Sequence, residues 1–184
     1  ILKGLADDGG LFVPDSIPAF DVSLDRLKGM SYQEVAYEVM KLFLSDYTEE
    51  ELKHCINSAY EDKFDTKKIA PLKEADGAYY LELFHGATIA FKDMALQIMP
   101  RLLSRALVKT GEENTALILV ATSGDTGKAA LEGHKDIDKV KIMVFYPGDG
   151  VSKVQKLQMV TQTGSNVNVC AIKGNFDDAQ TGVK

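Results

Sequence analysis

Hydrophobic positions change their spacing near residue 78, and this change divides the sequence into two parts. Before it, apolar residues recur at three- and four-residue intervals, as on the buried face of a helix. After it, short apolar runs alternate with helical stretches, an order typical of a parallel sheet covered by helices. We therefore predict an α/β protein: a mostly helical N-terminal domain over residues 1–77, followed by part of an open, mainly parallel three-layer α/β/α domain over residues 78–184.

Two helices are predicted in the first part, after a turn-rich start with glycine and aspartate pairs. Ser31 with Glu34, and Thr48 with Glu51, have the spacing of a capping box, which satisfies free N–H groups at a helix start. The apolar stripes that follow are expected to be core rather than a binding surface. The first stripe is Val35, Val39, Leu42 and Phe43, and the second is Leu52, Cys55, Ile56 and Ala59.

The second part, reached through a predicted linker over residues 65–76, contains four predicted strands. They cover residues 78–83, 116–121, 140–146 and 167–172. A helix is predicted over residues 95–107, and Pro100 should kink or offset it at a cost of ~3 kcal/mol, because proline lacks the N–H of a helical hydrogen bond. Another helix is predicted over residues 154–160. Ligands of open parallel sheets gather at the carboxyl ends of strands, and the motifs below lie at such ends.

Charge and composition exclude some functions. The chain has 184 residues and a net charge of −6, which argues against general nucleic-acid binding because phosphate contacts need a basic surface. Residues 1–78 carry −7 and residues 79–184 carry +1, which favours an anionic ligand in the second part. No apolar run approaches the ~18 residues of a membrane helix, and no signal-peptide pattern is present. We expect a cytoplasmic protein without a membrane partner.

The cysteines and histidines do not suggest a metal site. Cys55 and Cys170 are isolated in apolar surroundings, so we expect two buried free thiols in a reducing compartment. His54 and His134 have no partners at metal-ligand spacing. We therefore predict no metal ligand.

Residues 121–130, ATSGDTGKAA, form a glycine-rich turn between a predicted strand and a predicted helix, a general anion-binding arrangement. A Walker loop would need glycine at position 122 and a hydroxyl at position 129, where the chain has threonine and alanine. A dinucleotide fingerprint would need three glycines, and only Gly124 and Gly127 are present. What remains is a loop whose N–H groups and hydroxyls, from Ser123, Thr126 and Gly127, can bind a carboxylate.

Lys92 lies in the run LFHGATIAFKD, residues 83–93, just after a predicted strand. A lysine near a helix start is usually a solvated surface residue, but here Phe91 precedes it and Asp93 can cap the helix. A lysine that is partly desolvated in such a pocket can be a free amine, able to attack a carbonyl and to move protons. His85 is either a proton shuttle or a residue that orients the loop before Lys92.

Together the two motifs resemble the cofactor lysine and substrate loop of pyridoxal-phosphate enzymes of the tryptophan synthase β-like fold, fold type II. More narrowly, the chain resembles the threonine synthase family over nearly its whole length. The similarity begins in GLADDGGLFVPDSIP, residues 4–18, and ends in PGDGVSKVQKLQMVTQTGSNV and KGNFDDAQ. Asp125, where related enzymes commonly have asparagine, is similar to threonine synthases rather than to dehydratases or cysteine synthases. Ala87 stands where the family usually has proline.

The resemblance implies conversion of O-phospho-L-homoserine and water to L-threonine and phosphate, a step of threonine biosynthesis, with pyridoxal 5'-phosphate as the cofactor. Lys92 would hold the cofactor and act as the principal base, and Phe91 and Asp125 would contact the cofactor. Expected substrate-binding residues are Thr88, Ser123, Gly124, Thr126, Gly127, Ser152, Lys153 and Asn175. For Ser152 and Lys153 an anion site and a simple capped helix both stay open, and Asp177 and Asp178 are expected only to cap a helix.

The family's glycine-rich loop for the cofactor phosphate and its partner for the pyridine nitrogen do not occur in these 184 residues. We therefore expect a piece of a longer enzyme, which in isolation would expose unpaired sheet edges and bind the cofactor poorly or not at all. Two alternatives stay open. One is a threonine-synthase-like phospho-lyase or another lyase of the same fold, and the other is a noncatalytic binding module.

Overall fold

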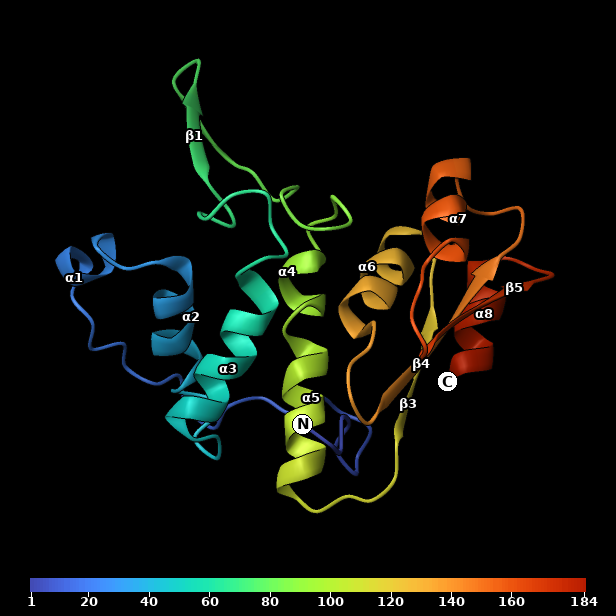
Figure 1. Cartoon of the computed structure of the whole chain (residues 1–184), viewed down its shortest axis with the longest axis horizontal. Coiled ribbons are helices and arrows are strands. Elements are labelled where there is room, and N and C mark those ends of the chain that lie inside the picture. Colours follow the sequence, from blue (N-terminus) through green and yellow to red (C-terminus); the bar gives the residue numbers. More distant parts are fainter.

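The computed structural model describes the whole chain, residues 1–184. Helices of the N-terminal part lie at one side and a parallel sheet lies at the other, with two central helices between them (Figure 1). No helix is both long enough and apolar enough to span a bilayer. Both cysteines are free; Cys55 is buried, but Cys170 is only partly buried because it lies in an edge strand of the sheet. The expectation of two buried thiols is therefore wrong for Cys170.

Three helices form the N-terminal part: α1 (Leu24–Lys28), α2 (Tyr32–Met40) and α3 (Glu49–Tyr60). Both predicted capping boxes are confirmed. At the start of α2 the Ser31 hydroxyl accepts from the Glu34 N–H while the Glu34 carboxylate accepts from the Ser31 N–H, and Thr48 and Glu51 do the same at α3. The predicted stripe of α3 is also confirmed, because all four of its residues are buried.

The predicted stripe of α2 is wrong. Val39 and Phe43 are exposed, and the helix ends at Met40. The residues that pack against the core are Tyr32, Ala36, Tyr37, Met40 and Leu44. Two of them are tyrosines, whose rings supply apolar area while their hydroxyls reach polar partners, so a count of aliphatic positions alone selects the wrong face.

Residues 72–81 form a hairpin, which corrects the predicted linker over 65–76 and the predicted sheet strand over 78–83. Strand β1 (Leu72–Ala75) pairs antiparallel with β2 (Ala78–Leu81). Asp76 and Gly77 have φ of 51° and 72°, the left-handed pair that a two-residue hairpin turn requires, and Asp-Gly is a strong signal for it. The hairpin projects from the body of the molecule (Figure 1), and every residue of both strands is exposed.

Pro100 divides the predicted helix over 95–107, as expected. Helix α4 (Asp93–Leu96) ends before it, and α5 (Met99–Lys109) begins with Pro100 in its first turn. A proline is tolerated there because the first N–H groups of a helix have no intrahelical acceptor. Lys92 is thus followed by a single helical turn.

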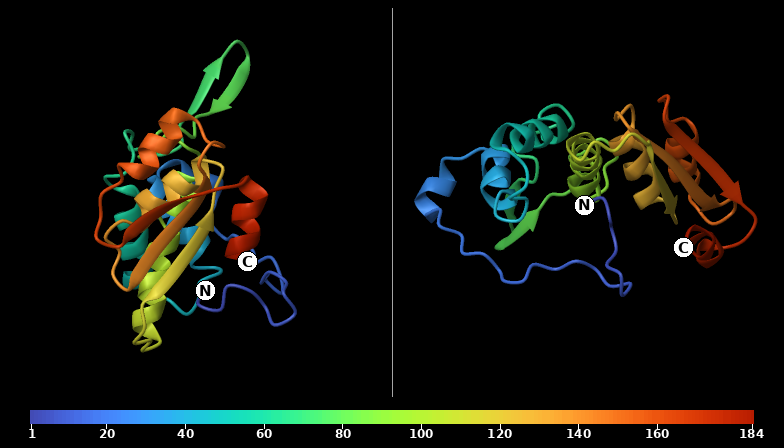
Figure 2. Two further views of the ribbon diagram at one scale, coloured as in Figure 1. Left: turned by 90° about the vertical axis from the view of Figure 1, so that its right-hand side faces the viewer. Right: turned by 90° about the horizontal axis from the view of Figure 1, so that it is seen from below.

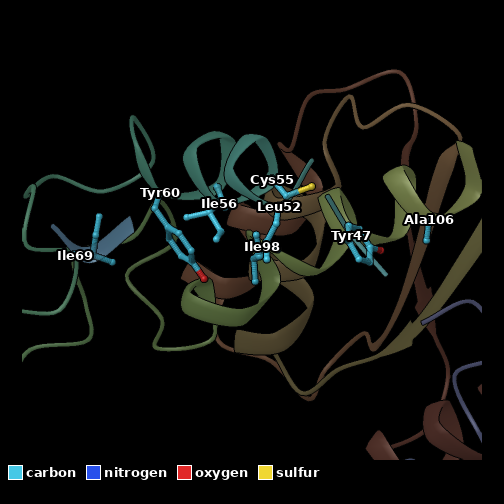
Figure 3. Close-up of a cluster of buried hydrophobic side chains, with 9 residues drawn as sticks. Tyr47, Leu52, Cys55, Ile56, Tyr60, Ile69, Ile98 and Ala106 are labelled. Carbon is cyan, nitrogen blue, oxygen red and sulfur yellow. The ribbon is translucent and has the colours of Figure 1, made fainter. Parts of the chain in front are cut away.

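A core cluster joins α3 to the central helices. Leu52 and Ile56 of α3 lie near Ile98, which separates α4 from α5 (Figure 3), and Ala106 of α5 belongs to the same cluster. Buried apolar side chains stabilise such a junction by roughly 1.5–3 kcal/mol each. Residues on both sides of residue 77 therefore share one core.

The C-terminal part contains a parallel sheet in the order β3 (Ala116–Ala121), β4 (Val140–Pro147), β5 (Val167–Ile172). These bounds confirm three predicted strands. One face of the sheet packs on α6 (Asp125–His134) and α7 (Lys153–Val160). Helix α8 (Phe176–Val183) lies against β3 and β4 on the opposite face (Figure 2). The predicted three-layer α/β/α arrangement is confirmed.

Three turns lie at the carboxyl edge of this sheet, because its strands are parallel. Residues 122–124 connect β3 to α6, residues 148–152 connect β4 to α7, and residues 173–175 connect β5 to α8. Helix α4 begins at the same end of the molecule (Figure 1). Lys92 and the predicted substrate loop therefore lie at one end of the fold.

Candidate active site

Lys92 is the residue immediately before α4, and its side chain is partly buried. Its Nζ lies 4.4 Å from the centroid of the Phe91 ring, a cation–π distance. None of the ion pairs in the chain includes Lys92. An amine that is partly desolvated and has no carboxylate partner is suited to nucleophilic and proton-transfer chemistry.

Asp93 anchors the loop before Lys92 instead of capping the helix, which corrects the predicted role. Its carboxylate accepts from the Thr88 N–H at 2.8 Å and from the Thr88 hydroxyl at 2.7 Å. α4 has no side-chain cap. A Cβ at Gly86 would be 2.5 Å from Asp93 Oδ2, so only glycine fits there. Thr88 itself is buried, and its hydroxyl is committed to Asp93; its contact with substrate stays a prediction.

Ile89 shows that the anchored loop is held in an unusual shape. Its φ is 62°, in the left-handed region that a β-branched side chain rarely adopts. The side chain is exposed, so its own burial does not hold it in place. Such conformations persist where the surroundings impose them, here between buried Thr88 and buried Ala90.

His85 lies between two carboxylates. Its Nδ1 is 2.5 Å from Asp65 Oδ1 and its Nε2 is 2.9 Å from Glu82 Oε2. The hydrogen bond to Glu82, followed by the one to Asp65, raises the pKa of His85 above its ordinary value. With both ring nitrogens engaged, the geometry favours orientation of the loop over proton shuttling. His85 also lines a groove of about 580 Å³ with the Phe84 ring that stacks on it.

Thr122, which is not among the residues predicted from the sequence, shapes the 123–127 loop. Its buried hydroxyl accepts from the Gly124 N–H at 2.9 Å and from the Gly127 N–H at 2.8 Å. The Gly127 N–H, predicted to face a ligand, is therefore already engaged within the loop. A hydroxyl residue at a strand end, two residues before a glycine, is the signal that could have identified this turn.

Other N–H groups of the loop remain free. Those of Ser123, Asp125 and Thr126 find no acceptor within the chain. They lie at or next to the start of α6, a helix of 10 residues, where the partial positive charge of the helix N-terminus favours an anion. Gly124, with φ of 142°, makes the turn possible.

Asp125 connects this loop to its neighbours. Its Oδ1 lies 3.0 Å from Nε2 of Gln155 in α7 and 3.2 Å from Nζ of Lys128 in α6. The hydrogen bond from Gln155 is the main cause that lowers the pKa of Asp125; Lys128 follows, and the charge of Lys92 adds to it. Helix α4 also packs on α6, so Lys92 and the 123–127 loop lie at the same end of the fold.

The starts of α7 and α8 are capped helices. Ser152 and Gln155 form a capping box at α7, while Lys153 is exposed. Asn175 and Asp178 form another at α8, which confirms the expected capping role of Asp178. The capped-helix alternative thus accounts for the contacts seen at Ser152. Ligand contacts of Ser152, Lys153 and Asn175 stay predictions, although all three lie at the carboxyl edge.

Comparison with solved structures defines the class of protein. The structure of pyridoxal-phosphate-bound threonine synthase from Brucella melitensis matches 98% of this chain with a TM-score of 0.88 and 38% identity, over 39% of that chain. The yeast threonine synthase structure matches 98% with a TM-score of 0.90 and 35% identity, over 38% of that chain. The chain therefore has the fold of fold type II pyridoxal-phosphate enzymes.

Sequence comparisons show which enzymes of this fold the chain is similar to. Residues 1–60 match the family model described as threonine synthase N terminus. Threonine synthase from Pseudomonas aeruginosa is 44% identical over 187 residues, which cover 100% of this chain and 39% of that protein. The chain is similar to threonine synthases over its whole length, and it spans about two fifths of the length of the curated relatives it matches.

Proposed function

We propose that this chain supplies the lysine and the carboxylate-binding loop of a threonine synthase active site, which converts O-phospho-L-homoserine and water to L-threonine and phosphate. The observation that carries the proposal is that α4, which Lys92 precedes, packs on α6, at whose start the 123–127 loop lies, so that both are at the carboxyl end of the sheet. Similarity to proteins named threonine synthase supports the choice of reaction.

The residues around Lys92 fit pyridoxal 5'-phosphate at its aldehyde end. The donor set is a partly buried primary amine without an ion-pair partner, next to the aromatic ring of Phe91. When bound, this cofactor supplies an electron sink for negative charge at the substrate carbon. We propose Lys92 as its covalent anchor, with Phe91 and Asp125 as further contacts. The Brucella melitensis relative has pyridoxal phosphate bound.

The carboxylate of the substrate is proposed to bind at the start of α6. The free N–H groups of Ser123 and Thr126, together with the Ser123 hydroxyl, offer the donors. Gly124 allows the turn. Gly127 contributes by its small size, because a Cβ there would be 2.5 Å from Cγ2 of Thr122. Held in this way, the substrate has a fixed orientation for removal of its Cα proton.

Lys92 is proposed to take and return that proton, because its amine is partly buried and has no ion-pair partner. Lys128 is paired with Asp125 and is less suited to the role. For the phosphate of the substrate we propose the start of α7, where Ser152 and exposed Lys153 lie, with Asn175 at the next turn. Thr88 is proposed as a substrate contact through the lone pairs of its hydroxyl oxygen, because its hydroxyl proton is donated to Asp93.

The proposal also covers the division of the chain into domains and its location in the cell. We propose a threonine synthase N-terminal domain over residues 1–77 and a cofactor domain over residues 78–184, supported by the change from helices to alternating strands and helices. A cytoplasmic location is supported by two free cysteines, which suit a reducing compartment. The net charge of −6 supports a small-molecule substrate rather than nucleic acid.

An absorbance spectrum with added pyridoxal phosphate tests the proposal, on this chain and on any longer protein that contains it. We expect a visible band that Lys92→Ala abolishes and that Lys156→Ala, a change at an exposed lysine of α7, retains. A band of equal strength in Lys92→Ala would contradict the role of Lys92. No band in either protein would favour a noncatalytic module. Phosphate release from O-phosphohomoserine, measured against turnover of serine and threonine, separates threonine synthase from other lyases of this fold.

A further inference from the structure

One side chain of α7, Gln155, reaches the carboxylate loop. Its Oε1 accepts from the N–H of Ser152 at 3.3 Å and from the Ser152 hydroxyl at 3.0 Å. Its Nε2 donates to Oδ1 of Asp125 at 3.0 Å. Because a backbone N–H can only donate, the amide oxygen must face Ser152, and the amide nitrogen must face Asp125. The capping box therefore fixes the direction of this contact.

The loop is shaped to accept Gln155. A Cβ at Gly124 would lie 2.5 Å from Cδ and 2.6 Å from Oε1 of Gln155. The φ of Gly124 is 142°, a value that other residues rarely adopt. Glycine at position 124 therefore serves both the turn and the close approach of Gln155.

The two oxygens of Asp125 have different surroundings. Nε2 of Gln155 contacts Oδ1 at 3.0 Å, and Nζ of Lys128 contacts the same oxygen at 3.2 Å. Oδ2 has no hydrogen-bond or ion-pair partner within the chain. The charged groups that act on Asp125 are Lys128 of α6 and Lys92 next to α4; Gln155 is the neutral donor from α7. One oxygen is thus held, and the other is free to accept a hydrogen bond.

We propose that Gln155 is the positioning residue of Asp125: by holding Oδ1 it fixes the orientation of the carboxylate and leaves Oδ2 to accept a hydrogen bond from the ligand at Lys92. The inference rests on the proposed function, because that function places a ligand with donor groups there. Helix α7 and the 123–127 loop then act as one unit. Lowering of the pKa of Asp125 by the Gln155 hydrogen bond is consistent with this role.

The first test measures Asp125 without any cofactor. The carbon-13 shift of its carboxyl group is followed against pH in the unchanged protein, in Gln155→Met and in Ser152→Ala. Both variants remove part of the capping box, but only Gln155→Met removes the donor to Asp125. We expect the midpoint to rise toward that of an ordinary aspartate in Gln155→Met and to change little in Ser152→Ala. Equal midpoints in all three proteins, or equal shifts in both variants, would overturn the proposal.

Gln155→Glu is the second variant, in case Gln155→Met does not fold. Glutamate keeps the acceptor for the Ser152 N–H but replaces the donor by a like charge beside Asp125. We expect a still larger rise in the Asp125 midpoint, because a second carboxylate disfavours ionisation. An unchanged midpoint would contradict a direct contact between the two side chains.

The last test asks whether the contact between Gln155 and Asp125 affects the binding of pyridoxal phosphate. We expect Gln155→Met to weaken pyridoxal-phosphate binding about tenfold, the scale of one lost hydrogen bond to a charged group. In an Asp125→Asn background the same change should have no more effect than Ser152→Ala. A tenfold loss that persists in that background would contradict action through Asp125. If neither this chain nor a longer protein that contains it binds pyridoxal phosphate, the proposed function fails, and the carbon-13 titration still decides the role of Gln155.

Discussion

Thr88 and Asp93 are joined by two hydrogen bonds, one from the N–H and one from the hydroxyl of Thr88 to the two carboxylate oxygens of Asp93. Both residues are buried, and Lys92 immediately precedes Asp93. The backbone position of Lys92 is therefore set by a closed loop of six residues, 88–93, rather than by a long helix. This ring holds Lys92 in place with little other secondary structure.

Removing both of these hydrogen bonds should destabilise the protein more than removing one of them. We expect Asp93→Ala to lower the free energy of unfolding by about 3 kcal/mol, because two buried donors of Thr88 lose their acceptor. Thr88→Val should cost about 1 kcal/mol, because the N–H contact remains. Urea unfolding followed by circular dichroism gives both values, with Asp62→Ala at an exposed site as the control. A loss for Asp93→Ala no larger than that of the control would contradict an anchoring role.

Gly133 should tolerate no side chain. A Cβ at this position would lie 1.9 Å from the carbonyl oxygen of Leu96, so an alanine would push α6 away from α4. We expect Gly133→Ala to lower the free energy of unfolding by about 3 kcal/mol. Gly182→Ala is the matched control, because it is also helical and meets nothing within 4 Å. It should stabilise by about 0.5–1 kcal/mol. Equal effects in thermal unfolding would contradict the close approach of the two helices.

Glu51 should make stability depend on acid pH. Hydrogen bonds from Lys109, from the Thr48 N–H and from Arg105 lower its pKa from 4.5 to about 2. The unfolded chain then binds more protons than the folded one between these values, so the stabilisation is complete above about 4.5 and is lost as pH falls toward 2. In melting temperatures from pH 2 to 6, Glu51→Gln should show a shallower slope than the unchanged protein. Glu50→Gln, at an exposed neighbour, should keep the original slope.

His85 should titrate above its ordinary range, because Glu82 and then Asp65 raise its pKa. The stabilisation is complete below the unfolded pKa of about 6.5 and is lost as pH rises through the folded value. NMR titration should show a lower pKa for His85 in Glu82→Gln and, to a smaller extent, in Asp65→Asn. If neither change moves the His85 resonance, the two carboxylates do not hold the imidazole in solution.

Local signals in the sequence predicted much of the fold. The capping boxes at Ser31 and Thr48 and the break at Pro100 all appear in the structure, because each depends on neighbours within a few residues. The strands β3, β4 and β5 were also predicted, since each is a short apolar run between turn residues. The Asp76–Gly77 dipeptide is an equally local signal, and it indicates a hairpin turn where a linker was predicted.

The parts of the site that were not predicted from the sequence depend on contacts between distant segments. Asp65 reaches His85 across 20 positions, and Gln155 reaches Asp125 across 30. No periodicity in the sequence reports such pairs, because they follow from how helices pack on the sheet. Lys92 and the 123–127 loop both lie at the end of the fold where the sequence placed them, but the side chains that hold them there could not be predicted.

The tyrosine contacts near Lys92 bear on how the molecule assembles. Tyr60 at the end of α3 donates its hydroxyl to the carbonyl of Met94, and Tyr47 donates to the carbonyl of Leu102. These bonds span 34 and 55 positions, and they satisfy carbonyls of the interrupted α4–α5 pair. During synthesis the N-terminal helices emerge first, so they are available as a template when the lysine-bearing turn leaves the ribosome. Two contacts that hold the segment after Lys92 therefore come from residues that are synthesised before it and before the sheet.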